Sequence, residues 1–183
     1  NVRIAIDPGH GGKDKGTAGY YPDVSEAEIN AVIAEKTAEA LADKGAEVKL
    51  IKTDPYLTLN QRLEAARAYD ANIYISIHSN SSVNTSATGS EVYYFYPFGQ
   101  TLASISSKQV SNALDTDNRG AKQARYWVTT DSRFASVLIE CGFLSNKSEY
   151  KKLTKSSYQD KVAEAIADSV ASYVKTISTG ISG

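Results

Sequence analysis

Short apolar runs alternate along this chain with segments of helical periodicity, and this alternation limits the architectures that the chain can adopt. Residues 2–6, 46–51 and 73–77 have the apolar runs or strict alternation that is typical of strands. Strands that take turns with amphipathic helices indicate an α/β fold with a mostly parallel central sheet. Further strands are predicted at 91–96, 124–128 and 135–140, and helices at 26–44, 58–69, 102–114 and 158–177.

Length and charge restrict both the number of domains and the kinds of partner. The 183 residues, of which 42% are apolar, are enough to bury one sizeable core, so we expect a single domain over 1–177 and a short tail at 178–183. Twenty basic against 21 acidic residues leave a net charge of −1, which excludes the basic surface of a typical nucleic-acid-binding protein. The longest apolar runs have about half a dozen residues, far fewer than the roughly 20 of a transmembrane helix, so no membrane span is predicted.

The chain has two histidines, and each follows a predicted strand. His10 lies in IDPGHGG after the run 2–6, and His78 lies in SIHSN after the run 73–77. Because ligands of open parallel sheets bind beyond the carboxyl ends of the strands, the two imidazoles should share one crevice. Imidazole is also the most common protein ligand of transition metals. The matched positions therefore favour one metal site over two separate packing roles.

Glutamates are the candidates for the remaining roles at such a site. A catalytic zinc ion takes about three protein ligands and leaves a position for water, while a further carboxylate moves the proton. Glu26 falls in the first turn of the helix 26–44, where the helix dipole alone also favours an acid, and Glu28 is the alternative ligand. Glu140 lies inside the apolar run VLIECGF, where a carboxylate is costly unless it is paired or functional. The spacing leaves open which glutamate is the ligand and which is the base.

Other residues near these positions are predicted to be structural. Cys141 adjoins Glu140 in a strand, so the two side chains should point to opposite faces. We therefore expect Cys141 to be a small buried apolar residue rather than a nucleophile. Asp7 could orient His10 or support the turn at Pro8, and we favour the turn.

Several motifs, in a fixed order, cover the chain nearly from end to end. They are IDPGHGG at 6–12, SEAE at 25–28, LTLNQR at 57–62, SIHSN at 76–80, RGAKQARYWV at 119–128 and IECGFLSN at 139–146. With these motifs the chain resembles the zinc-dependent N-acetylmuramoyl-L-alanine amidases of the amidase-3 type, which are bacterial cell-wall hydrolases. The resemblance implies a single α/β domain with a twisted, mostly parallel sheet of about six strands and helices on both faces.

The resemblance also implies a role for each candidate residue. His10, Glu26 and His78 would bind one zinc ion, which decides the choice of ligand in favour of Glu26, and Glu140 would be the catalytic residue. Such an enzyme cleaves the amide bond between the lactyl group of N-acetylmuramic acid and the first L-alanine of the peptidoglycan stem peptide. The alternatives are a zinc carboxypeptidase or endopeptidase that acts on stem peptides, and a non-catalytic glycan-binding module.

The place of action follows from the same resemblance. Peptidoglycan is the expected partner, and we expect a secreted, monomeric autolysin that works in the cell wall. The balanced charge and the short apolar runs described above predict that it binds no nucleic acid and does not span a membrane. A cell-wall-binding module elsewhere in the full-length protein is compatible with this expectation.

Overall fold

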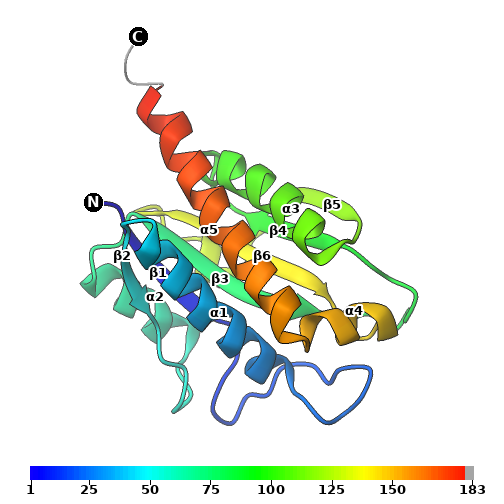
Figure 1. The fold of residues 1–183 in the computed structure, drawn as a ribbon. Helices are drawn as coiled ribbons and strands as arrows, with labels where there is room; N and C mark the ends of the chain where they lie inside the picture. The colour runs from blue at the N-terminus through cyan, green and yellow to red at the C-terminus, as the bar shows by residue number, and fades with distance from the viewer. Residues whose placement is uncertain (180–183) are drawn as a thin grey trace.

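The predicted alternation of strands and helices is present in the structure, a computed structural model that describes residues 1–179 (Figure 1). In chain order, the elements are β1 (Arg3–Pro8), α1 (Glu26–Asp43), β2 (Glu47–Leu50), α2 (Leu59–Ala68), β3 (Ile73–Asn80), β4 (Ser90–Tyr94), η1 (Pro97–Gly99), α3 (Gln100–Leu114), β5 (Asn118–Gln123), η2 (Trp127–Thr129), β6 (Ala135–Phe143), α4 (Lys147–Leu153) and α5 (Ser156–Thr179). The elements η1 and η2 are short 3₁₀ helices.

Six strands within residues 1–179 form one sheet in the order β2-β1-β3-β6-β4-β5. Neighbouring strands are parallel except for β4 and β6, which are antiparallel. The central strands β1, β3 and β6 are buried along nearly their whole length, as expected for strands that are covered on both faces. The structure thus confirms the predicted single α/β domain with a mostly parallel sheet of about six strands.

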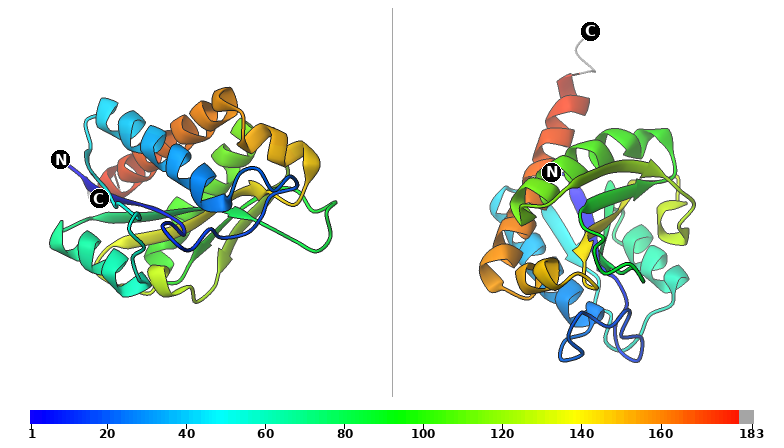
Figure 2. Two further views of the ribbon diagram at one scale, coloured as in Figure 1. Left: turned by 90° about the horizontal axis from the view of Figure 1, so that it is seen from below. Right: turned by 90° about the vertical axis from the view of Figure 1, so that its right-hand side faces the viewer.

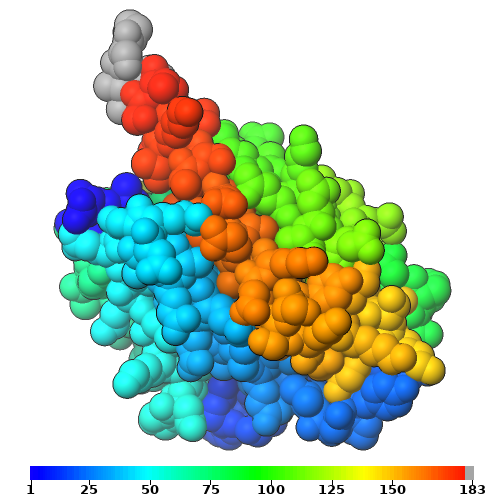
Figure 3. All heavy atoms as spheres, in the orientation of Figure 1, coloured from blue at the N-terminus to red at the C-terminus, as the bar shows by residue number. Residues whose placement is uncertain are grey.

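Helices cover both faces of this sheet, as predicted (Figure 2). The helices α1, α3 and α5 pack on one face, where Ile33, Val110 and Ile166 join the larger apolar core. In a space-filling view these helices form a continuous layer over that face (Figure 3). On the other face α2 and η2 contribute Leu63 and Val128 to a smaller core.

The second face is covered over only part of its width. The smaller core packs on Ala5 of β1, Tyr74 of β3 and Leu138 of β6. Tyr93 of β4 is in register with Leu138, and Lys122 of β5 is in register with Tyr93, so all of these side chains belong to the same face. Tyr93 and Lys122 remain partly exposed. The β4 and β5 end of this face is therefore open to solvent beside the covered part.

One predicted strand is misplaced. The segment predicted at 124–128 contains the apolar residues Trp127 and Val128, but these lie in η2, and the strand β5 is formed by Asn118–Gln123. β5 is an edge strand with mostly polar residues, so it lacks the apolar alternation that marks a strand with a buried face. The short helix α4, which begins after the N-cap Asn146, is not among the predicted elements.

The last helix reaches the expected tail. α5 ends at Thr179, inside the segment 178–183, and residues 180–183 lie outside the described part of the chain. Among residues 1–179, no helix combines the length and the apolar character that crossing a membrane requires.

Candidate metal and catalytic site

The structure brings His10, Glu26 and His78 together at one edge of the sheet. His10 follows β1, Glu26 is the first residue of α1, and His78 lies near the end of β3. One nitrogen or oxygen atom from each of the three lies within 4.8 Å of the others. Glu26 connects the histidines, because its Oε2 is 3.1 Å from His10 Nε2 and its Oε1 is 3.1 Å from His78 Nδ1. Two imidazoles and one carboxylate are a donor set that suits zinc.

Two glycines allow these side chains to approach so closely. A Cβ atom on Gly9 would lie 2.3 Å from the imidazole of His78, and a Cβ atom on Gly16 would lie 2.5 Å from Glu26 Oε2. Gly16 also has a φ of +67°, in the left-handed region that favours glycine. His10 has a φ of 66°, an uncommon conformation that histidine adopts more readily than most residues. The backbone around His10 is thus shaped to present its ring to Glu26.

Glu26 is buried, and hydrogen bonds hold its carboxylate in place. The side-chain amide of Asn30 and the backbone N–H of Ser79 donate to Oε1, and the backbone N–H of Thr17 donates to Oε2. Burial by itself raises the pKa of Glu26, but the hydrogen bonds with His10 and the other histidine lower it more, so its net pKa lies well below the usual range. Glu26 is therefore a permanent negative charge in this site.

The surroundings of His10 also favour positive charge. Its hydrogen bond with Glu26, against the opposing effect of burial, raises the pKa of His10 to about 9. Asp14 adds to this effect, since its Oδ2 is 2.9 Å from His10 Nδ1, the ring nitrogen that faces away from Glu26. Surroundings that stabilise positive charge at His10 are also electrostatically suited to a divalent cation. The contact with Asp14 has no sequence signal, because it lies in an irregular loop.

Glu140 stands beside this cluster with an unsatisfied oxygen. It lies on β6 in register with His78 of β3, so the two side chains project from the same face of neighbouring strands. Its Oε2 is buried and has no hydrogen-bond partner among the described residues. Burial, together with the negative charges of Glu26 and Glu91 and against the positive influence of His78, raises the pKa of Glu140 to about 7. A carboxyl group with this pKa can both take up and release a proton near neutral pH.

The structure places the two glutamates that are candidate ligands, Glu26 and Glu28, in different surroundings. Glu28 forms a capping box with Ser25, in which its carboxylate accepts from the backbone N–H and the hydroxyl of Ser25 at the exposed start of α1. Glu26, in contrast, faces the two histidines. Cys141 packs in the larger core, and burial raises the pKa of its thiol, so it has the structural role expected for it.

The expectation that Asp7 supports the turn at Pro8 is not met. Asp7 is buried and forms an ion pair of 2.7 Å with Arg62 of α2, and it accepts hydrogen bonds from the hydroxyl groups of Tyr74 and Ser76. A buried carboxylate needs such partners, and a turn at the surface does not supply them. Asp7 therefore holds α2 against the sheet below the site.

Arg62 connects α2 to the loop that carries His10. Its guanidinium donates to the backbone carbonyls of Pro8 and His10, at 2.7 and 2.5 Å, and to that of Leu57 at 3.2 Å. Sequence reasoning missed this role; Arg62 is buried in α2 together with Leu63 and Ala66.

Replacing Arg62 by methionine should lower the free energy of unfolding by about 3–5 kcal/mol, because Asp7 would remain as a buried charge without its counterion. Urea denaturation monitored by circular dichroism measures this loss. The matched control is Arg3→Met, which breaks the pair with Asp70, whose side chain is 86% exposed; it should cost less than about 1 kcal/mol. Equal losses in the two variants would contradict the structural role of Arg62.

Comparison with known proteins decides the family. The family model described as N-acetylmuramoyl-L-alanine amidase (amidase-3) matches residues 4–172, which is nearly the whole chain. The chain belongs to this amidase family. The predicted enzyme class, N-acetylmuramoyl-L-alanine amidase, is thereby confirmed.

Several curated proteins and solved structures are similar to this amidase. It is 37% identical over 175 residues to the uncharacterized protein YqiI of Bacillus subtilis (strain 168), a match that covers 93% of this chain and 84% of YqiI. It is 35% identical to the N-acetylmuramoyl-L-alanine amidase LytC of the same organism, but the match covers 94% of this chain and only 35% of LytC. The catalytic domain of CwlV, an N-acetylmuramoyl-L-alanine amidase from Bacillus (Paenibacillus) polymyxa var. colistinus, has a TM-score of 0.91 and 32% identity, with 96% of this chain and 99% of that domain covered.

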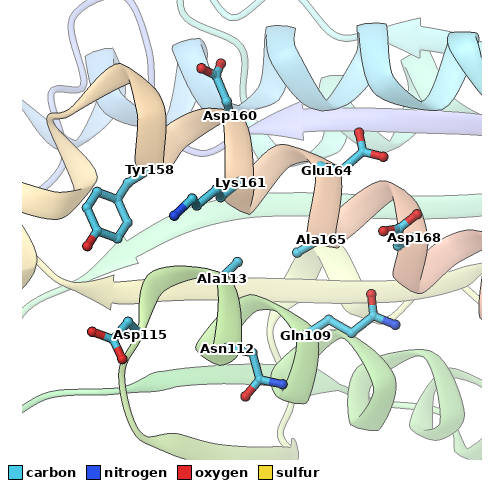
Figure 4. A pocket seen from close by; sticks show the side chains of 10 residues that line it. All are labelled: Gln109, Asn112, Ala113, Asp115, Tyr158, Asp160, Lys161, Glu164, Ala165 and Asp168. Carbon is cyan, nitrogen blue, oxygen red and sulfur yellow. The ribbon is translucent and has the colours of Figure 1, made fainter.

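A cleft of about 150 Å³ adjoins the histidines of this amidase. Its wall on the α2 and η2 side includes Tyr56, Tyr126 and Trp127, and it reaches His10 and His78. Another groove lies on the opposite, helix-covered face between α3 and α5, where its lining side chains are mostly polar (Figure 4). None of the candidate site residues lines that second groove. Of these two hollows, the cleft is the one lined by candidate metal ligands, namely His10 and His78.

Proposed function

We propose that this amidase hydrolyses the bond between the lactyl group of N-acetylmuramic acid and the L-alanine of the stem peptide, with one zinc ion held by His10, Glu26 and His78. The observation that carries the proposal is the unpartnered carboxyl oxygen of Glu140 beside a His-Glu-His group whose ligand atoms lie within 4.8 Å of one another. When bound, zinc supplies Lewis-acid polarisation of the substrate carbonyl and lowers the pKa of a water molecule.

Glu140 performs the proton transfers in this proposal. In its deprotonated form it accepts a proton from the water whose oxygen attacks the lactyl carbonyl carbon. As the carbon–nitrogen bond breaks, the protonated carboxyl group returns that proton to the departing amine of L-alanine. The pKa of about 7 suits both steps, because neither form is strongly disfavoured near neutral pH.

Peptidoglycan and the cell wall are the proposed substrate and location. Relatives named probable cell wall amidase LytH, from several Staphylococcus species, support this location. The LytH of Staphylococcus saprophyticus is 31% identical to this chain over 172 residues. The match covers 57% of that LytH, so action as a secreted autolysin is proposed for the whole protein.

The test of the proposed function is the identity of the products. Purified peptidoglycan is digested with the zinc-loaded protein, and the soluble products are analysed by mass spectrometry. The proposal expects intact stem peptides with a free L-alanine amine and glycan with free lactyl carboxyl groups. Stem peptides that are shortened but still attached to the glycan would indicate a carboxypeptidase or endopeptidase instead. Binding to peptidoglycan without any released product, unchanged by a chelator, would indicate a glycan-binding module.

Replacing Asp14 by asparagine should weaken zinc binding by about 10–100-fold, because carboxylates that hydrogen-bond a metal-binding histidine orient its ring and raise its basicity. Competition with a chromophoric chelator measures the affinity. The control is Glu28→Gln, which alters the exposed capping box of α1 and should leave the zinc affinity unchanged. If Glu28→Gln weakened binding and Asp14→Asn did not, the proposed ligand set would be wrong.

A further inference from the structure

A pair of cations meets one buried carboxylate on the open part of the sheet. Glu91 of β4 is 3% exposed, and it accepts hydrogen bonds from Arg119 Nε at 2.8 Å, from the ammonium group of Lys122 and from the hydroxyl group of Tyr93 at 2.6 Å. These hydrogen bonds outweigh the effect of burial and lower the pKa of Glu91, so it carries a full negative charge. Within this cluster the two cations against one carboxylate leave a surplus of one positive charge, which the neighbouring Glu140 offsets only when it is deprotonated.

This cluster lies directly beside the proposed catalytic carboxylate. Glu91 of β4 and Glu140 of β6 are cross-strand partners, so their side chains project from the same face of the sheet. Neighbouring strands are about 4.8 Å apart. Because Arg119 and Lys122 reach back from β5 to Glu91, their charged groups are displaced from Glu140 by roughly one strand spacing.

The cations retain unused hydrogen-bonding capacity. The side chains of Arg119 and Lys122 are 39% and 37% exposed. Arg119 Nη1 donates to the carbonyl of Thr88, whereas its Nη2 has no partner among residues 1–179. The ammonium group of Lys122 has three hydrogens, and its hydrogen bond to Glu91 uses one of them. Donors remain on both side chains for an incoming anion.

Two tyrosines connect the cleft to this cluster. Tyr126 lines the cleft, and its ring packs on Tyr93 with 4.8 Å between centroids, while the hydroxyl group of Tyr93 donates to Glu91. In peptidoglycan, the stem peptide carries free carboxylates and the N-acetylated glycan strand is otherwise uncharged. Charge complementarity would therefore direct the peptide, rather than the glycan, toward the cations of β5.

We propose that Arg119 and Lys122 form a subsite for a carboxylate of the stem peptide, the one on the residue that follows L-alanine. This inference rests on the proposed function and adds the direction in which the substrate lies. An extended residue spans about 3.5 Å, so a carboxylate one or two residues beyond the scissile amide reaches a cation about one strand spacing from Glu140.

The test compares two synthetic muramoyl peptides that differ in one group. The residue after L-alanine carries a carboxylate in one and a carboxamide in the other. The wild-type enzyme should prefer the carboxylate by about tenfold in kcat/KM, mainly through KM, because a charge-assisted contact is lost with the carboxamide. Lys122→Gln should reduce this preference to about threefold or less, and Lys122→Arg should retain it.

The matched control is Lys161→Gln, because Lys161 lies on α5 (Figure 4), which packs on the other face of the sheet. This variant should keep the wild-type preference. In a second measurement, calorimetry with the zinc-loaded Glu140→Gln protein should show tighter binding of the free peptide that carries the carboxylate. Equal rates of the wild-type enzyme on both substrates would overturn the subsite and leave the proposed function intact. Failure to cleave either substrate would overturn the proposed function itself.

Discussion

Replacing Glu140 by glutamine should reduce the turnover of peptidoglycan by about 10²–10⁴-fold, the usual contribution of a general acid and base. Glutamine has nearly the same shape but cannot exchange a proton. The variant should still bind one zinc ion, since Glu140 is not among the three residues whose ligand atoms converge. The release of soluble product measures turnover, and elemental analysis measures bound metal.

The matched control for this variant is Glu35→Gln, which changes an exposed glutamate of α1 in the same way. Its turnover should equal that of the wild type. Turnover by Glu140→Gln at the wild-type rate would rule out the assigned role. Loss of zinc from Glu140→Gln would instead make Glu140 a fourth ligand.

Alanine at His10 or at His78 should abolish stoichiometric zinc binding, and activity should be lost with the metal. Each change removes one of the three proposed ligands. The affinity should therefore fall by more than about 100-fold, because groups that only support a ligand already account for about 10–100-fold. Equilibrium dialysis followed by elemental analysis provides the measurement.

A chelator provides the corresponding experiment on the unmodified protein. Removal of the metal should silence the wild-type enzyme, and added zinc should restore its activity but not that of His10→Ala. Stoichiometric zinc in His10→Ala after dialysis would refute the proposed ligand set. Unchanged wild-type activity after complete removal of metal would refute the metal mechanism.

All strands except β5, and the positions of the two histidines, could be predicted because they depend on local patterns. Buried parallel strands have apolar runs that can be recognised from sequence, and the carboxyl end of such a strand fixes where the next side chains lie. The choice between Glu26 and Glu28 has no such local signal. The two residues point to different sides of one helical turn, and only the position of α1 relative to His10 and His78 decides which of them meets the histidines.

The supporting residues were beyond prediction for a related reason. Asp14, Arg62 and Glu91 act through polar contacts with segments that are distant in the chain or irregular, and such contacts leave no periodic pattern. Arg62 is the easiest of the three to predict, because a cation among the buried residues of α2 requires a buried acceptor. The edge strand β5 was misplaced because its exposed residues do not need to be apolar.

The partly covered second face of the sheet has a consequence for the kind of polymer that this enzyme can attack. Because α2 and η2 cover this face over β1, β3 and β6 while Tyr93 and Lys122 stay partly exposed, we expect a long molecule to approach the site from the side, without being threaded through an opening. Hydrolysis then needs no free chain terminus. Such a geometry suits a cross-linked mesh, in which most scissile bonds lie far from any end.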